Sequence, residues 1–170
     1  MNQHVYDRHS TVEIPLILEL IKERIDACPG QVLTKKLKKQ RVPVNDVPVR
    51  VDSIRLQTFL LSGIKCHHCG LEASFFAIER DRKSEPGASY HLNLWGVDQE
   101  GEELIFTHDH KLARALGGPD NINNTQTLCG ACNWKKGELE GLIVEKIIEL
   151  GKDHPEVVKL KASLHHLTGT

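Results

Sequence analysis

The sequence predicts an α+β fold, with helical segments at both ends and a β-rich middle. Residues 12–27 and the stretch after Asn133 place apolar side chains at the three- and four-residue spacing of an amphipathic helix. The middle contains three runs rich in β-branched and aromatic residues, at 73–80, 89–97 and 103–109. We therefore divide the chain into a helical and basic N-terminal region at 1–52, a core at 53–138 and C-terminal helices at 139–170.

The N-terminal region is expected to contain a helix and a small hairpin. In the helix at 12–27, Pro15 is compatible with the first turn alone, and Pro29-Gly30 ends the helix. The alternating VPVNDVPVRV segment, with Asn-Asp at its centre, predicts a hairpin that its prolines restrict to the edge of a sheet. Ser53 is a candidate cap for a helix over 54–62.

The second half of the chain changes from strands to helices. The D-Q-E-G sequence at 98–101 predicts a turn between the last two strands. Residues 110–128 are expected to form an irregular loop, because Gly-Gly-Pro breaks any regular element there. A helix is predicted from Asn133 to a stop at Gly151, and a last helix from Asp153-His154-Pro155 onward.

Composition limits where the chain works. No apolar run approaches the roughly 18 residues that a membrane-spanning helix needs, and the N-terminus lacks the apolar stretch of a signal peptide. We therefore expect a cytoplasmic protein without a membrane partner. Aromatic residues make up 5% of the chain, which argues against a surface that stacks the bases of single strands.

The net charge of −1 does not by itself indicate a nucleic-acid partner, but the basic residues are unevenly distributed. Residues 1–65 hold 11 Lys/Arg against 7 Asp/Glu. The excess is concentrated in one run, TKKLKKQR, with Lys35, Lys36, Lys38, Lys39 and Arg41. Such a run makes phosphate contacts in some proteins and is a solvated helix face in others, and charge alone leaves both interpretations open.

Four of the five cysteines form two C-x-x-C pairs: Cys66 and Cys69, and Cys129 and Cys132. In a chain without a secretion signal this pattern indicates zinc before disulfides. Four thiolates complete a closed tetrahedral site, which is structural because it has no open position for catalysis. His67 and His68 lie within the first pair and are expected to be exposed, and Cys28 is expected to be a packing residue.

A closed zinc site does not explain Asp109-His110, which ends the last predicted strand. Neighbours on a strand point to opposite faces, so the two side chains are expected to have different roles. A carboxylate is a hard ligand for Mg²⁺ or Mn²⁺, and a neutral imidazole suits a general base. Asn133 can supply a second oxygen ligand, and Asn124 can bond across the loop and hold His110 in place.

The segments DHKLARALGG and NTQTLCGACNWKKG resemble the motif of the HNH endonucleases, the ββα-metal nucleases. The resemblance covers about residues 53–138, and CHHCGLEASFFAIER is similar to a zinc-bearing subgroup often encoded by bacteriophages. It implies a ββα-metal core with His110 as general base, Asp109 and Asn133 as metal ligands and Asn124 as the residue that orients the loop. Asn133 stands where many members have histidine, and this departure favours a hard ion.

The resemblance also implies a substrate and a reaction. The substrate would be double-stranded DNA, hydrolysed with one Mg²⁺ or Mn²⁺ ion to a 5′ phosphate and a 3′ hydroxyl. Arg114 and Lys136 are candidates to hold phosphates, and His108 ranks below His110 as the base. Since one active site cuts one strand, double-strand cleavage needs a homodimer or two events.

A non-catalytic alternative stays open at this point. The chain would then be a zinc-stapled module that binds DNA or serves in an assembly. A decayed nuclease site is expected to lose Asp109, His110 or Asn133, and all three are present. The nuclease is therefore the favoured interpretation, with its target sequence and biological role undetermined by the sequence.

Overall fold

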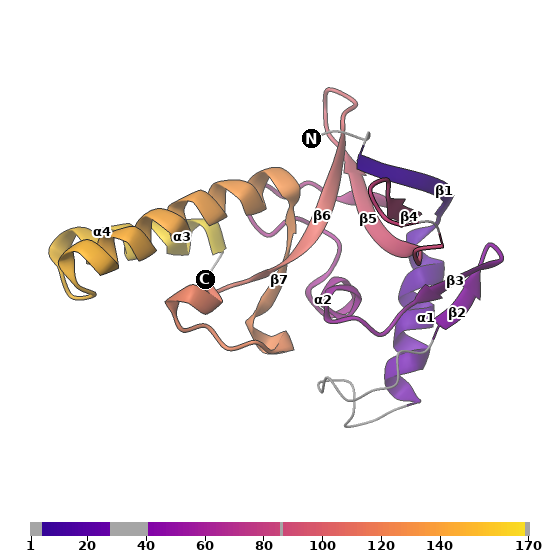
Figure 1. The fold of residues 1–170 in the computed structure, drawn as a ribbon, viewed down its shortest axis with the longest axis horizontal. Helices are drawn as coiled ribbons and strands as arrows, with labels where there is room; N and C mark the ends of the chain where they lie inside the picture. The colour runs from indigo at the N-terminus through magenta and orange to yellow at the C-terminus, as the bar shows by residue number, and fades with distance from the viewer. Residues whose placement is uncertain (1–4, 28–40, 86, 169–170) are drawn as a thin grey trace.

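The computed structural model describes residues 5–27, 41–85 and 87–168, with side chains as far as Leu164, and has the predicted α+β fold (Figure 1). A five-stranded antiparallel sheet runs through it in the order β1-β4-β5-β6-β7. Its strands are β1 (Tyr6–Val12), β4 (Ala73–Asp81), β5 (His91–Val97), β6 (Glu103–His110) and β7 (Thr125–Cys129). The three strands predicted in the middle of the chain are confirmed, and so is the turn at 98–101, where Gly101 N donates to Asp98 O.

The N-terminal strand β1 was not expected. Its sequence, YDRHSTV, is mostly polar, and its residues are half-buried or exposed except Val12, so it lacks the alternation of a strand with one buried face. Pairing with β4 forms it. The helix that follows, α1 (Ile14–Asp26), starts after Val12, which belongs to the strand, and it carries Pro15 in its first turn as predicted.

The predicted hairpin is present as β2 (Arg41–Val44) and β3 (Val47–Arg50), a two-stranded sheet of its own. Asn45 and Asp46 have φ of 47° and 64°, the conformation that a two-residue hairpin turn requires. Of the basic run, Arg41 begins β2, whereas Lys35, Lys36, Lys38 and Lys39 lie outside the described residues, as does Cys28.

The core lies between one face of the five-stranded sheet and helices α1 and α2 (Ile54–Ser62). Ser53 caps α2 as predicted, with its Oγ accepting from Leu56 N at 3.3 Å. Phe59 of α2 packs on Phe76 of β4, with ring centroids 6.3 Å apart. This packing fixes the position of α2 against the sheet that carries the Asp109-His110 pair.

The prediction of an irregular loop over 110–128 was wrong in part. The segment holds two short 3₁₀ turns, η2 (Arg114–Leu116) and η3 (Ile122–Asn124), and then β7, which pairs with β6 along its whole length. All five residues of β7 are buried, so the strand lacks the alternating pattern that reveals a strand with one exposed face.

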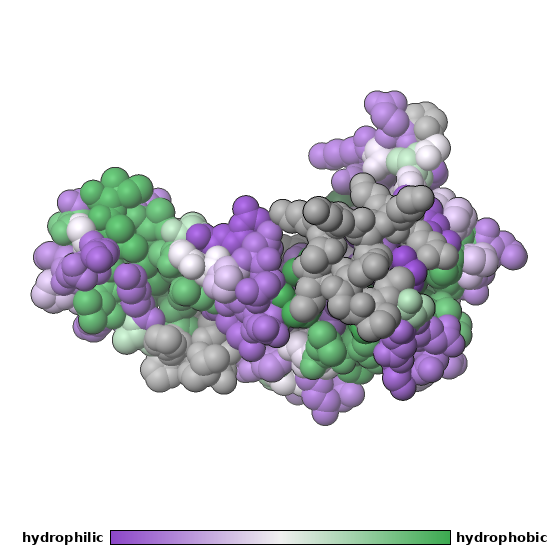
Figure 2. Space-filling model, turned by 90° about the horizontal axis from the view of Figure 1, so that it is seen from below, coloured by the Kyte–Doolittle hydropathy of each residue, from purple (hydrophilic) through white to green (hydrophobic). Residues whose placement is uncertain are grey.

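Two helices complete the chain. Helix α3 (Gly130–Leu150) begins three residues earlier than predicted and ends before Gly151, whose φ of 89° confirms the predicted stop. Helix α4 (Pro155–Thr168) folds back on α3, and the pair extends away from the sheet (Figure 1). Apolar side chains gather on this end of the molecule (Figure 2), among them the exposed Leu142, Ile148 and Val158. None of the helices in the described ranges is long and apolar enough to cross a bilayer.

Candidate active site and four-cysteine cluster

The four paired cysteines come together in one cluster. The first pair lies on a turn after α2, Cys129 ends β7, and Cys132 lies in the first turn of α3. The sulfur atoms all lie within 4.8 Å of one another. Among the described residues no histidine joins them, and His67 and His68 are exposed as predicted.

Backbone hydrogen bonds set the position of the first cysteine pair. Gly70 N donates to Cys66 O at 2.9 Å, and the φ of 75° at Gly70 allows the tight turn. His67 N donates to Thr127 O at 3.0 Å, which ties this turn to β7. The turn is therefore held beside the strand that delivers the second pair.

The chemistry of the cluster fits a zinc ion. Burial raises the pKa of the Cys132 thiol to about 12, whereas hydrogen bonding from Cys129 lowers that of Cys66 to about 4. The sulfurs are so close that ionising one thiol opposes the ionisation of the others, and a bound cation removes this penalty. Two-residue spacing in both pairs and a donor set of four sulfurs are those of a closed structural zinc site.

Asp109 and His110 end β6 and point to opposite sides of the sheet, as expected of neighbours on a strand. They pair in register with Gln126 and Thr125 of β7. The His110 ring lies on the same side as His108, and its Nε2 is 3.2 Å from Oδ1 of Asp120. The Asp109 carboxylate lies on the other side, toward α3.

The Asp109 carboxylate is held by two partners. Gln126 Nε2 donates to Oδ2 at 3.0 Å, and Lys136 Nζ lies 3.1 Å from Oδ1. The ammonium group of Lys136 also donates to the backbone O of His110 at 2.8 Å and to Oε1 of Glu140. Both oxygens of Asp109, the His110 carbonyl and Glu140 therefore surround one buried cation.

This burial changes the expected role of Lys136. We expected it to hold a phosphate, but its side chain is 1% exposed and its ammonium group is already surrounded by protein oxygens. Lys136 therefore links the end of β6 to α3 through these contacts. Arg114, the other expected phosphate ligand, is 66% exposed, and its Nη1 lies 3.9 Å from Oδ2 of Asp120.

Asn124 bonds across the loop between β6 and β7. Its Oδ1 accepts from Leu112 N at 3.1 Å, and its Nδ2 donates to Leu112 O and Pro119 O at 3.0 and 2.9 Å. The same loop needs glycine at 118, because a Cβ there would lie 1.8 Å from Leu112 O. The loop that carries Asp120 to His110 is thus closed by one asparagine and one close backbone contact.

Asn133 is half-buried on α3, one turn before Lys136. Residues three apart share a helix face, so Asn133 belongs to the same side of α3 that meets β6. Asn133 is the second proposed metal ligand, and the structural observations on it are its partial burial and its position on this face of α3.

Comparison with known families supports these observations. The sequence model of the HNH endonuclease family matches residues 98–139. The chain carries an HNH domain. The match spans β6, β7 and the first half of α3, and so contains Asp109, His110 and Asn133 together with the second cysteine pair. No curated protein and no solved structure matches the chain.

His108 lies next to His110 within the HNH domain, with ring centroids 6.2 Å apart. Burial lowers the pKa of His108, and the positive charges of Arg55 and His110 lower it further. Its partly buried and cationic environment therefore favours the neutral ring.

Three residues that contact the candidate site were not predicted from the sequence: Asp120, Gln126 and Glu140. Asp120 follows Gly-Gly-Pro, a position typical of a turn residue. Gln126 belongs to strand β7, which was not predicted. Glu140 stands four residues after Lys136, a spacing typical of an ion pair on a helix, which is the one signal that was available.

Proposed function

We propose that this chain is a metal-dependent DNA endonuclease that hydrolyses phosphodiester bonds at its HNH domain. The observation that carries the proposal is the end of β6, where an imidazole and a carboxylate leave adjacent positions on opposite sides of the strand. A rigid loop closed by Asn124 lies on one side, and helix α3 on the other. An acid and a base supported separately suit a metal ligand and a proton acceptor.

His110 is the proposed general base. With its Nε2–H donated to Asp120, the Nδ1 atom is left to take a proton from the attacking water. The Asp120 carboxylate orients the ring and stabilises the imidazolium that forms, as an acid beside a catalytic histidine does. Arg114, exposed beside Asp120, is the proposed ligand for a phosphate on the same side.

Asp109 and Asn133 are the proposed ligands of one divalent ion. A carboxylate and an amide oxygen are hard donors, which favours Mg²⁺ or Mn²⁺. The buried Oε1 of Gln126 has no hydrogen-bond partner among the described residues, and the amide that bears it already bonds Asp109. When bound, the ion supplies positive charge for the oxygens of the phosphate and the leaving 3′ hydroxyl.

The remaining parts of the proposal concern partners and setting. Double-stranded DNA is the proposed substrate, cleaved to a 5′ phosphate and a 3′ hydroxyl, and zinc is the proposed occupant of the four-cysteine cluster. The basic run ending at Arg41 is a proposed contact for phosphates outside the active site. We also propose that the protein is cytoplasmic, that it is encoded by a bacteriophage and that it cleaves DNA as a homodimer.

One observation favours the non-catalytic alternative. Lys136 already neutralises Asp109, so a divalent ion at Asp109 requires the ammonium group to move away from that carboxylate and keep Glu140 as its partner. If a divalent ion does not replace Lys136 at Asp109, the chain would be a zinc-stapled DNA-binding or assembly module. The two functions differ in their response to divalent ions.

Supercoiled plasmid distinguishes them. The protein is incubated with plasmid in Mg²⁺, in Mn²⁺ and in EDTA, and the products are separated on a gel. The endonuclease yields nicked or linear DNA with either ion and none in EDTA. DNA that is bound but uncut under every condition supports the non-catalytic module.

A further inference from the structure

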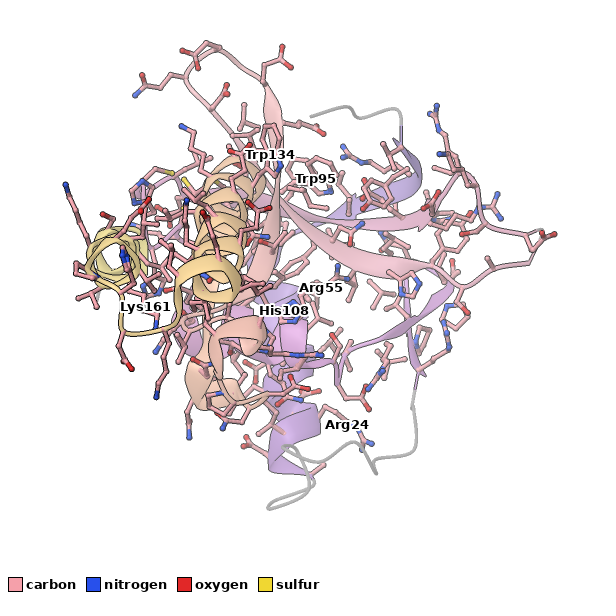
Figure 3. The ribbon with its side chains drawn as sticks, turned by 60° about the vertical axis from the view of Figure 1, so that its left-hand side comes forward. Arg24, Arg55, Trp95, His108, Trp134 and Lys161 are labelled. Atoms are coloured by element: carbon pink, nitrogen blue, oxygen red, sulfur yellow. The ribbon has the colours of Figure 1, made fainter. Side chains whose placement is uncertain are left out.

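A pocket beside His108 is lined by basic and hydrogen-bonding groups that the proposed mechanism does not use. Its volume is about 310 Å³. The hairpin strand β3, the first turn of α2, the start of β5 and the end of β6 form its wall. The polar lining residues are Arg50, Ser53, Arg55, His91 and His108. Figure 3 shows Arg55 and His108 next to each other in this region.

Arg55 brings a positive charge to this pocket and contacts no carboxylate, since Glu79, which raises its pKa through space, is itself paired with Arg8. Arg55 donates from Nη2 to the backbone O of Leu92 at 2.8 Å, and it forms no ion pair within the described part of the chain. Burial lowers the pKa of its guanidinium group, which is the sign of a desolvated charge. Desolvating a charge without a countercharge costs free energy, so the position is suited to an anion from outside the chain.

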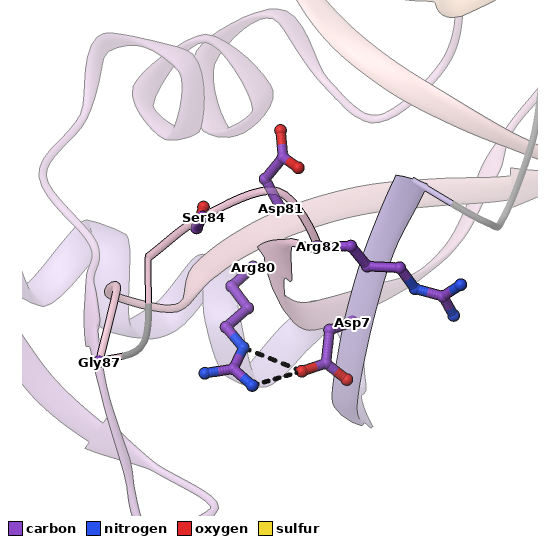
Figure 4. Close-up of a pocket in the computed structure, with 6 residues that line it drawn as sticks. All are labelled: Asp7, Arg80, Asp81, Arg82, Ser84 and Gly87. Atoms are coloured by element: carbon purple, nitrogen blue, oxygen red, sulfur yellow. Dashed lines mark hydrogen bonds and ion pairs between the residues drawn. The ribbon is translucent and has the colours of Figure 1, made fainter.

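Another pocket of the same molecule shows the contrasting arrangement (Figure 4). It is lined by Arg80 and Arg82 together with Asp7 and Asp81. Arg80 pairs with Asp7 at 2.7 Å, so its guanidinium is neutralised within the protein. In the pocket at Arg55, Arg50 is likewise paired, with Asp52, but no acidic residue lines the pocket and Arg55 is left without an ion pair, which makes it the better site for an anion.

The pocket at Arg55 continues toward the proposed general base. His108 lines the pocket, and its ring lies 6.2 Å from that of His110 on the same side of β6. A strand of DNA with its scissile phosphate at His110 would therefore pass the mouth of this pocket. The first turn of α2, capped by Ser53, adds the positive end of a helix to the same wall.

We propose that this pocket binds a backbone phosphate of the DNA strand, next to the phosphate that is cleaved, with Arg55 as its principal ligand. The inference rests on the proposed function, since it places the substrate of the HNH domain. Guanidinium groups bind phosphate oxygens through two parallel hydrogen bonds, and Arg55 has donors beyond the one that Leu92 uses. His91, at the start of β5, supplies a further hydrogen-bond donor in the lining.

The test is DNA binding by Arg55→Gln in a His110→Ala background, which removes cleavage. Affinity for a short duplex is measured by fluorescence anisotropy over a series of salt concentrations. We expect roughly tenfold weaker binding, the loss of one charge-assisted contact. The slope of log affinity against log salt should fall by about 0.9. Lys161→Ala removes the same charge on α4, a helix that lies away from α2 (Figure 1), and should leave both values unchanged.

Two further variants separate binding from folding. Arg55→Lys keeps the charge, so it should retain the salt slope while losing part of the affinity. His91→Gln should weaken binding without changing the slope at pH 8, where the imidazole is neutral. With His110 restored, Arg55→Gln should raise KM and leave kcat unchanged, because the phosphate contact is present before and during the reaction. Wild-type affinity and slope in folded Arg55→Gln and His91→Gln proteins would overturn the inference.

The outcomes also distinguish this inference from the proposed function. If the wild type cuts DNA and Arg55→Gln binds and cuts like the wild type, the phosphate pocket fails alone. If no cleavage occurs but Arg55→Gln weakens binding as expected, the nuclease proposal fails and the phosphate pocket is supported.

Discussion

The buried ammonium group of Lys136 lies 3.1 Å from each carboxylate oxygen of Asp109. The contact joins the end of β6 to the first half of α3, the two elements that carry the proposed metal ligands. Glu140 adds a second carboxylate, and burial raises its pKa although Lys136 acts to lower it. One internal cation thus balances two acids.

Removing that cation should destabilise the fold. In Lys136→Met both carboxylates lose their partner, and breaking a buried ion pair in this way typically costs about 3–5 kcal/mol. Urea unfolding measures the loss, with the exposed Lys135→Met as the matched control. Adding Glu140→Gln to Lys136→Met should restore part of the stability, because one of the uncompensated charges is removed. Equal stability of the Lys136→Met and Lys135→Met proteins would contradict this role.

The four-cysteine cluster should hold one zinc per chain and contribute directly to folding. The two cysteine pairs come from different parts of the chain, and Cys66→Ser or Cys132→Ser removes one ligand from one pair. Each variant should therefore lose zinc and stability. Metal analysis of protein purified without added zinc, together with thermal unfolding, checks this. Cys28→Ser, outside the two pairs, should leave the zinc content at one. A zinc-free protein with wild-type stability would refute the assignment.

The proposed metal ligands should control the ion that supports cleavage. Asp109→Asn keeps the shape of the side chain and its place beside Gln126, but it removes the charge that attracts a divalent ion. We expect cleavage to require much higher Mg²⁺ and to be partly restored by Mn²⁺. Asn133→His should stay active and shift its preference toward ions that accept imidazole nitrogen. Unchanged dependence on Mg²⁺ in both variants would show that neither residue binds the ion.

The titration of His91 tests the electrostatics of the phosphate pocket. Burial lowers the pKa of His91, and the positive charges of Arg55 and Arg41 lower it further. The folded state therefore favours the neutral ring, so its contribution to stability is present above pH ~6.5 and is lost as pH falls through the folded pKa. In Arg55→Gln the pKa of His91 should rise, as followed by NMR of the ring protons. An unchanged pKa would show that Arg55 does not act on His91.

Local sequence signals were sufficient for most elements of the fold. Asn45-Asp46, Ser53 and Gly151 each impose a local geometry, and the structure has the expected turn, cap and stop at these positions. Strands β1 and β7 were missed because neither alternates: β1 is mostly polar and β7 is buried throughout. Their formation depends on partners far along the chain, β4 and β6, which local patterns do not encode.

Some features of the candidate site could likewise be predicted from local sequence, and others could not. Spacing alone predicted the cysteine cluster and the opposite directions of Asp109 and His110. The partners of these residues come from tertiary contacts, so the ion pair with Lys136 and the contact of His110 with Asp120 had no local signature. The position of Lys136 near the motif predicted a phosphate ligand, and only its burial in the structure argues against that role.

The proposed role of His110, to accept the proton from the attacking water, is tested most directly by the single-turnover cleavage rates of His110→Ala and His108→Ala. His110→Ala should cut plasmid about 10²–10⁴-fold more slowly in Mg²⁺, while its DNA affinity and zinc content stay at wild-type values. His108→Ala, on the same side of β6, should be much less affected. Abolished cleavage in His108→Ala with wild-type cleavage in His110→Ala would contradict this role and make His108 the base.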